Sequence, residues 1–300
     1  MKVLIPLSCF YAALCAVLTG AIAAPALAQT QLDLNNDTPA FQGKPLQSGK
    51  IRVTVNYEPY NAKPRPDSEP FKNLQYRIFY NNQLQIEASD TTLYTGNVTL
   101  RDLDGDRSAE VIVNTFSGGA HCCTSFTIYS WKNSKFVKTE TGFLDGNGGS
   151  FQDLDNNGKV EFITYDNAFL YAFSSYAGSS PPTKILALQQ GQLRDVTRQY
   201  PKALRSRLNQ MYEGFVERKR NGGFDLNGVL AGYVAQKILV GEYRQGWDFM
   251  LANYDRSSDW GLSILDRNGN TVGKYPDFPT ALRAFLIQQK YLDAQGRPLK

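Results

Sequence analysis

A nine-residue acidic turn occurs twice in this chain, and each copy stands directly before a run of β-branched and apolar residues. The first copy covers residues 102–110 and reads DLDGDRSAE, and the second covers residues 153–161 and reads DLDNNGKVE. Oxygen-bearing side chains stand at the first, third, fifth and ninth positions of both copies. Calcium is a hard cation that takes about six to eight oxygen ligands in flexible geometry. The sequence therefore predicts two calcium sites, each on a tight turn that leads into a β-strand.

The spacing of the two turns favours a repeated β-unit over two unrelated loops. They lie 51 residues apart, close to the roughly 40–50-residue period of propeller blades. A leucine follows the first aspartate in both copies, Leu103 and Leu154, as a buried anchor would. An EF-hand is excluded, because it requires flanking helices and an acid at its twelfth position, where these turns have Val113 and Thr164.

The pattern Asp-x-Asp-x-Asp-x-x-x-Glu/Asp between two strands resembles the FG-GAP/VCBS-type repeat of integrin-like β-propellers, whose loop binds calcium between the outer strands of a blade. The similarity covers about residues 75–195. By position, the resemblance implies the following ligands: Asp102, Asp104, Asp106, Glu110 and the Ser108 carbonyl in the first loop, and Asp153, Asp155, Asn157, Glu161 and the Lys159 carbonyl in the second. A closed propeller usually needs at least four blades. Two full repeats and a leading group of strands leave a partial propeller and a sandwich as open alternatives.

The hydrophobic periodicity changes once along the chain. Alternating strand patterns run from residue 51 to residue 188, and a helical period of three and four begins near Pro201. This order predicts an α+β fold, with propeller-blade-like β-repeats followed by a mostly α-helical region. The expected divisions are a flexible N-terminal arm over residues 29–49, a calcium-binding β-repeat region over 50–195 and a mainly helical region over 196–300.

The first 28 residues have the pattern of a signal peptide. Lys2 precedes an apolar run, and Ala26-Leu27-Ala28 supplies the small-x-small site at which cleavage is expected. Leu14 stands before Cys15, which does not fit a lipoprotein signal. No later stretch approaches the roughly 18 apolar residues of a membrane span. We therefore expect an exported protein, periplasmic or secreted, without a transmembrane anchor after cleavage.

Gly118-Gly119-Ala120-His121-Cys122-Cys123 holds the only histidine and both cysteines outside the signal peptide. Three interpretations stay open: a disulfide between Cys122 and Cys123, a soft-metal site that uses His121 and the thiolates, and small residues buried in a strand. The run is similar to one found in exported bacterial proteins, a likeness that carries no activity with it.

No familiar catalytic constellation stands out, since the chain has a single histidine and neither a Gly-x-Ser-x-Gly elbow nor a phosphate loop. The favoured hypothesis is an extracytoplasmic, non-catalytic calcium-binding module that contacts a protein or a polysaccharide, with no nucleic-acid partner. An exported enzyme is the alternative, either a hydrolase or a redox protein that uses Cys122 and Cys123. A third hypothesis is that the basic stretch Arg194–Arg220 binds an anionic wall or membrane polymer.

Overall fold

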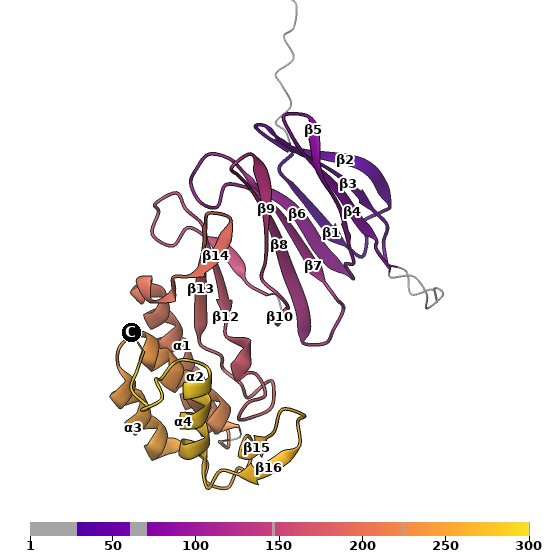
Figure 1. Ribbon diagram of the computed structural model, residues 1–300. Coiled ribbons are helices and arrows are strands. Elements are labelled where there is room, and N and C mark those ends of the chain that lie inside the picture. Colours follow the sequence, from indigo (N-terminus) through magenta and orange to yellow (C-terminus); the bar gives the residue numbers. More distant parts are fainter. Residues whose placement is uncertain (1–28, 61–70, 146–147, 224, 300) are drawn as a thin grey trace, which may run out of the picture.

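The computed structural model describes residues 29–60, 71–145, 148–223 and 225–299, and the signal peptide predicted over residues 1–28 lies outside this set. Strands fill the N-terminal part and helices dominate the C-terminal part, so the predicted α+β class is confirmed (Figure 1). The strands of the first part are β1 (Gln31–Asn35), β2 (Phe41–Ser48), β3 (Ile51–Tyr57), β4 (Leu74–Tyr80), β5 (Gln83–Asp90), β6 (Thr95–Arg101), β7 (Glu110–Phe116), β8 (Cys122–Lys132), β9 (Lys135–Glu140), β10 (Leu144–Asp145), β11 (Ser150–Gln152), β12 (Glu161–Tyr165), β13 (Thr183–Gln189) and β14 (Gln192–Asp195).

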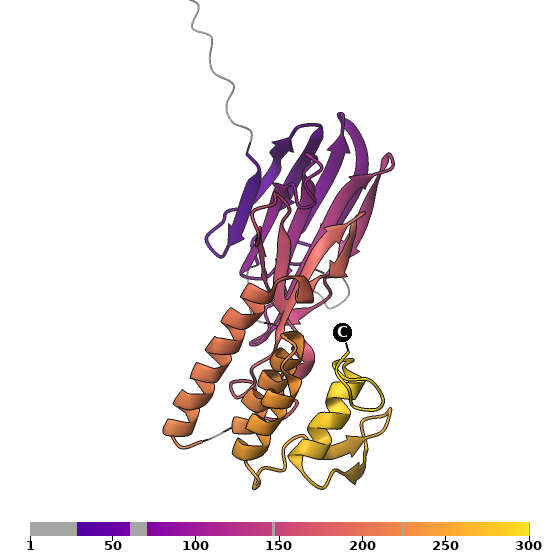
Figure 2. The same cartoon turned by 90° about the vertical axis from the view of Figure 1, so that its left-hand side faces the viewer.

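These strands form three antiparallel sheets, in which most strands pair with the next along the chain. One sheet has the order β2-β3-β4-β5, and another has the order β11-β12-β13-β14. The middle sheet contains β6-β7-β8-β9, with β1 added beside β6 and β10 paired with β8. Figure 1 shows the three sheets as successive layers, and Figure 2 shows the strands at one end of the molecule and the helices at the other.

Both faces of the middle sheet are buried, which explains why β7 has consecutive apolar residues instead of an alternating pattern. Val111 and Val113 pack in the cluster shared with the sheet β2–β5. Ile112 points to the opposite face and packs with Phe162 and Leu188 of the sheet β11–β14. Adjacent side chains of a strand point to opposite faces. The three neighbouring residues Val111, Ile112 and Val113 therefore pack in two separate hydrophobic cores.

The expectation of a flexible arm over residues 29–49 is wrong. Residues Gln31–Asn35 pair with β6, and Phe41–Ser48 pair with β3. Leu32 and Leu34 are buried on one face of β1, and Leu46 is buried in β2. The polar composition of the segment hides this short alternation, although three buried leucines are enough to hold two strands onto the sheets.

The C-terminal part is a group of helices with one small hairpin. Its elements are the 3-10 turns η1 (Asn167–Phe169) and η2 (Thr197–Gln199), the helices α1 (Pro201–Arg220), α2 (Leu226–Leu239), α3 (Tyr243–Asn253) and α4 (Phe278–Gln288), and the strands β15 (Ser263–Leu265) and β16 (Thr271–Lys274). Helix α1 begins at the proline that the sequence indicates, since proline suits the first helical position. Within the described ranges, no helix is both long and apolar enough to cross a membrane.

The link between β12 and β13 fastens the helices to the β-sheets. Phe169 and Phe173 of this link are buried among the helices. A Cβ atom at Gly232 of α2 would clash with the carbonyl of Ser180, so the helix and the link are in direct contact. Gln236 of α2 is buried, accepts a bond from the Thr183 N–H and donates to the carbonyl of Leu204.

Candidate metal centres

The two acidic turns occupy equivalent places in two meanders. The first joins β6 to β7, and the second joins β11 to β12. The main-chain N–H of Val160 donates to the carbonyl of Leu103 across 2.8 Å, so the turns lie side by side. The fold therefore brings the two sets of predicted ligands into one corner of the molecule.

The turns follow the same backbone path. Their fourth and sixth residues have positive φ in both copies: 76° at Gly105, 60° at Asn156, 69° at Arg107 and 83° at Gly158. Glycine stands at the fourth position of the first turn and at the sixth of the second, yet the conformations match. The path is therefore common to both loops, although the residues that adopt it differ.

Matching hydrogen bonds hold each turn closed. The first Asp of each turn accepts from the N–H of the sixth residue, the fifth side chain accepts from the N–H of the seventh, and the final Glu accepts from the N–H of the second. These bonds are Arg107 N to Asp102 Oδ2, 2.8 Å, and Gly158 N to Asp153 Oδ2, 2.9 Å; Ser108 N to Asp106 Oδ1, 2.8 Å, and Lys159 N to Asn157 Oδ1, 2.7 Å; Leu103 N to Glu110 Oε2, 2.8 Å, and Leu154 N to Glu161 Oε2, 3.1 Å. In each turn, three predicted ligands are thus positioned by the backbone.

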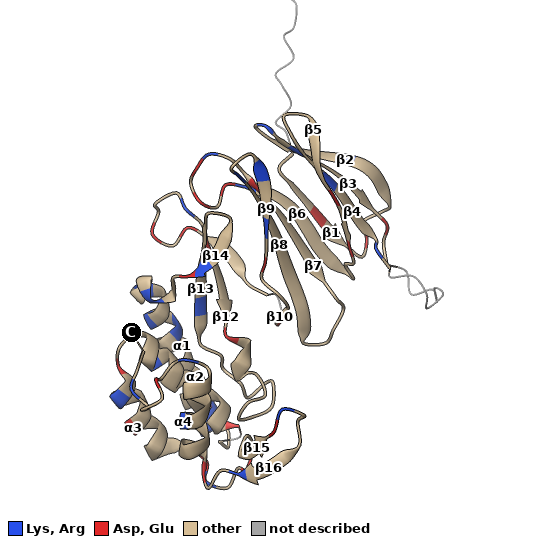
Figure 3. Cartoon of the chain, viewed as in Figure 1, with Lys and Arg blue, Asp and Glu red and all other residues tan. Residues whose placement is uncertain are grey.

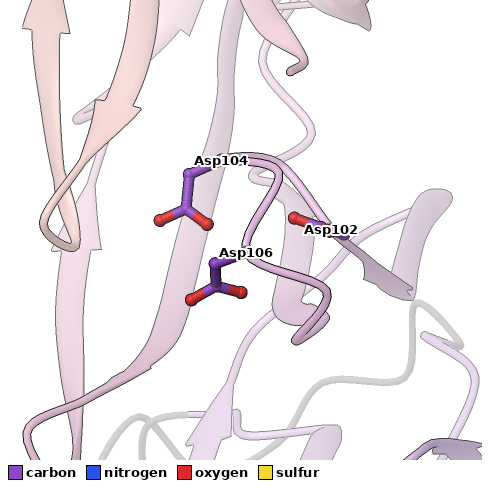
Figure 4. A group of neighbouring side chains, drawn as sticks. All are labelled: Asp102, Asp104 and Asp106. Atoms are coloured by element: carbon purple, nitrogen blue, oxygen red, sulfur yellow. The ribbon is translucent and has the colours of Figure 1, made fainter. Parts of the chain in front are cut away.

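Acidic oxygens converge in both turns. One oxygen each from Asp102, Asp104 and Asp106 lies within 4.8 Å of the other two. Figure 4 shows Asp104 and Asp106 projecting to the same side of the loop. In the second turn Asp153, Asp155 and Glu161 meet the same limit. Calcium–oxygen distances are about 2.3–2.6 Å, so oxygens that share one ion are at most about 5 Å apart, and both groups fit.

A lysine from a neighbouring strand reaches into the first turn. Lys132 ends β8, and its Nζ lies 2.6 Å from both Asp104 Oδ2 and Asp106 Oδ2 and 3.9 Å from Glu110 Oε1. Its side chain is only 12% exposed. Asp104 Oδ1 and Glu110 Oε1 are buried without a hydrogen-bond partner in the described part of the chain. The Lys132 ammonium therefore pairs with Asp104 Oδ2 and Asp106 Oδ2 and leaves Asp104 Oδ1 and Glu110 Oε1 without a hydrogen-bond partner.

The ionisation of the first turn reflects its burial. Burial raises the pKa of Glu110 to about 8, against an opposing effect of the Leu103 N–H. For Asp106 burial acts in the same direction, but hydrogen bonds from Lys132 and the Ser108 N–H outweigh it and hold the pKa below its usual value. Burial alone would lower the pKa of Lys132, yet its bonds to Asp104 and Asp106 raise it. The lysine is therefore charged and serves as the cation of this turn.

The second turn has a different neighbour. Burial and a hydrogen bond to Glu161 raise the pKa of Tyr200, whose hydroxyl donates to this carboxylate. Among the described residues, no basic side chain forms an ion pair with Asp153, Asp155 or Glu161. Backbone N–H groups, that of Gly158 foremost, lower the pKa of Asp153.

Strand register explains the difference between the turns. Val111 and Phe162, which follow the final Glu of each turn, pair with Tyr129 and Leu186 respectively. Three residues further along these partner strands stand Lys132 in the first meander and Gln189 in the second. Gln189 is uncharged and exposed. No local pattern in the sequence marks Lys132 or Tyr200, but the strand register shared by the two meanders points to the lysine.

The cysteines lie at the start of β8, away from both turns. The sulfur atoms of Cys122 and Cys123 are joined as a disulfide. The neighbouring His121 ring stacks on Tyr176, with 4.1 Å between ring centroids. The hydroxyl of Tyr176 in turn donates to Asp145 Oδ1 across 2.6 Å.

Comparison with known proteins identifies relatives. Residues 204–290 match the family described as the sll0997 C-terminal domain. The chain is 34% identical over 274 residues to the probable thylakoid lumen protein sll0997 of Synechocystis sp., covering 88% of this chain and 79% of that protein. It is 34% identical over 194 residues to the uncharacterized protein y4bJ of Sinorhizobium fredii, covering 62% of this chain and 30% of that protein. No solved structure matches.

These relatives bear on the location of the protein. The thylakoid lumen is an extracytoplasmic compartment, so the prediction of an exported protein is confirmed. The match to the lumen protein extends over most of both chains, and the family match covers α1 to α4. The chain belongs to the sll0997 family.

Proposed function

We propose that this exported protein is a non-catalytic calcium-binding module that mediates contact with a protein or a glycan. In this proposal β6–β9 and β11–β14 are propeller-blade-like repeats of the FG-GAP/VCBS type, each with a calcium loop between its first two strands. The sheet β2–β5 is a further meander, and the strands form a partial propeller. Calcium fixes the loops and hence the strands that present the binding surface.

The observation that carries the proposal is the matched pair of turns. Two segments of different sequence have positive φ at the same two positions and the same three backbone-to-side-chain bonds. The first Asp of each turn accepts through both oxygens, and each oxygen still has a second lone pair for a cation. Acidic oxygens gathered within 4.8 Å repel one another unless a cation lies between them.

The two turns differ in what a calcium ion must displace. In the second turn, the ion meets Asp153, Asp155, Asn157, Glu161 and the Lys159 carbonyl without a competing ammonium. In the first turn, the ion must displace Lys132 before it reaches Asp104 and Asp106. We therefore assign the tighter site to the second turn and the weaker site to the first.

Thermal unfolding in calcium and in chelator tests the proposal. A ligand that binds only the folded state at 100 times its Kd stabilises that state by about 2.7 kcal/mol. For a chain of this size, the expected rise in Tm is about 5 °C. Magnesium at the same concentration is the control for ionic strength. The double variant Asp104→Ala, Asp155→Ala should lose the shift, and coincident melting curves of the unmodified protein in calcium and chelator would refute calcium binding.

A further inference from the structure

A cleft of about 710 Å³ lies where the sheet β11–β14 meets helix α1. Its lining includes Asp145, Tyr165, Asn167, Tyr176 and Arg207. The cleft is separate from the acidic turns: Tyr165 ends β12, whereas Glu161 of the second turn begins it. At about 3.3 Å per residue, these two residues lie about 13 Å apart.

Tyrosine rings border this cleft. Tyr165 and Tyr176 belong to the lining, and Tyr165 is 43% exposed. The ring of Tyr176 stacks on His121, with 4.1 Å between centroids, and lies 5.6 Å from the ring of Tyr171, which stands outside the lining. Tyr171 has a φ of 60°, an unfavourable conformation for a bulky residue, and its carbonyl accepts a 2.8 Å bond from the indole of Trp260. The chain therefore holds Tyr171 in a costly conformation beside Tyr176, next to the cleft but outside its lining.

Arg207 contributes to the cleft lining a guanidinium that has no acidic partner among the described residues. Its guanidinium lies 4.8 Å from the centre of the Tyr165 ring, and its Nη2 donates to the Pro181 carbonyl across 3.2 Å. Its Nε is buried and has no hydrogen-bond partner within the described ranges, where no acid forms an ion pair with it either. Arg207 belongs to the basic stretch Arg194–Arg220, and Figure 3 colours several positions along α1 blue for Lys and Arg.

The acid in the cleft is already engaged. Asp145 accepts the hydroxyl of Tyr176 through Oδ1 across 2.6 Å, and among the described residues it forms no ion pair with Arg207. The remaining polar lining consists of amide and hydroxyl side chains, such as Asn167 and Ser150. A complementary ligand therefore has a ring with an apolar face for the tyrosines, hydroxyl groups for the amide and serine, and a carboxylate for the guanidinium.

We infer that this cleft binds a uronic-acid residue of an acidic glycan, with the sugar ring on the tyrosines and the carboxylate at Arg207. The inference deepens the proposed function, because it names the ligand class of the interaction module. A peptide with a free C-terminal carboxylate has the same charge. It is the weaker candidate, since the hydroxyl groups of a sugar match the polar lining better than a peptide side chain does.

Calorimetric titration with a trimer of galacturonic acid tests this inference on the mature protein. The matched probe is the same trimer with its carboxylates methyl-esterified, which keeps the rings and removes the charge. We expect the acid form to bind at least about tenfold more tightly than the ester, because the ester loses the charge-assisted bonds to Arg207. This comparison needs no variant and so does not depend on a variant's folding.

Variants then locate the binding site. Arg207→Gln should weaken binding of the acid trimer about tenfold, and Tyr176→Ala should weaken binding of both probes. Arg205→Gln is the matched control on the same helix: its guanidinium is exposed, pairs with Glu242 and lies outside the cleft lining, so binding should not change. Thermal unfolding of each variant checks that it is folded.

Several results would overturn the inference: no binding of the acid trimer, equal binding of acid and ester, or equal losses in Arg207→Gln and Arg205→Gln. Binding of a short peptide through its free carboxylate without binding of the trimer would also overturn it. Titrations in calcium and in chelator separate this inference from the calcium proposal. If calcium binding fails and the trimer still binds, only the calcium proposal is wrong.

Discussion

The two acidic turns share one backbone conformation but differ in their electrostatic surroundings. Both are closed by the same three hydrogen bonds, and each ends in a buried glutamate, Glu110 or Glu161. The first turn has the ammonium of Lys132 among its carboxylates, whereas the register-equivalent residue of the second meander is Gln189. A cation that belongs to the chain is present at any calcium concentration. In the proposed function, the first turn is therefore stable without calcium, whereas the charge of the second turn is balanced by a bound calcium ion.

The largest expected effect follows from removing the internal cation. In chelator, Lys132→Met leaves the largely buried Asp104 and the half-exposed Asp106 without their partner, and we expect a loss of about 3 kcal/mol in the free energy of unfolding. In calcium, the same variant should recover most of this loss, because the ion enters a turn that the lysine no longer occupies. Urea unfolding in both buffers measures the two values, and calorimetry should show a second tight site for calcium.

Gln189→Met is the matched control for this variant. It changes the equivalent residue of the second meander, which is exposed, and should alter neither stability nor calcium stoichiometry. If Lys132→Met retains full stability in chelator and gains no calcium site, the lysine does not serve as the cation of the first turn.

The next largest expected effect is the loss of calcium stabilisation in variants of the predicted ligands. Asp155→Asn keeps the size of a second-turn ligand and removes its charge, so most of the calcium stabilisation of about 2.7 kcal/mol should disappear. Asp104→Asn should leave most of that stabilisation in place and instead weaken the protein in chelator, because Lys132 loses a partner. Thermal melts with and without calcium separate the two outcomes. The reverse result, with the shift abolished only by Asp104→Asn, would place the tighter site in the first turn.

Glu110 gives the first turn a characteristic pH dependence. Burial raises its pKa from 4.5 to about 8, so between these values the calcium-free folded protein keeps a proton that the unfolded chain has lost. Stability must therefore fall as the pH rises through this window. Glu110→Gln cannot ionise, so it should match the unmodified protein near pH 5 and exceed its stability near pH 8.

We expect the advantage of Glu110→Gln at pH 8 to be on the order of 2 kcal/mol, since water entering a buried site on ionisation reduces the full penalty. Urea unfolding in chelator at both pH values measures it. A difference between the two proteins that does not change with pH would mean that Glu110 is ionised in the folded state.

Local patterns in the sequence were sufficient to predict much of this fold. Alternation located most strands from β3 to β13, and Pro201 marked the start of α1, because these signals depend on neighbouring residues. The arm over residues 29–49 was mispredicted since its strands are stabilised by partners distant in sequence, β6 and β3. A few buried leucines in a polar segment do not reveal such partners.

The same distinction applies to the candidate site. The nine-residue spacing was sufficient to predict which acidic side chains lie close together, because a turn is a local structure. Lys132 lies 22 residues beyond Glu110 in a β-hairpin, where a lysine ordinarily indicates a solvated position. Only strand register turns it toward the carboxylates, and register was not available from periodicity alone. The cleft around Arg207 depends on the contact between α1 and the β12–β13 link, and no sequence motif predicts this contact.

The smallest expected effect tests whether the two backbones are equivalent. The sixth residue has positive φ in both turns, yet it is arginine in the first and glycine in the second: Arg107 at 69° and Gly158 at 83°. A Cβ at Gly158 would meet no atom within 4 Å, so Gly158→Ala should cost about 1 kcal/mol through backbone strain alone. Arg107→Gly relieves the same strain and should stabilise the first turn by about 0.5 kcal/mol, the gain being reduced by the greater freedom of glycine in the unfolded chain. Urea unfolding in chelator measures both, and changes of the same sign would show that the two turns do not share one backbone path.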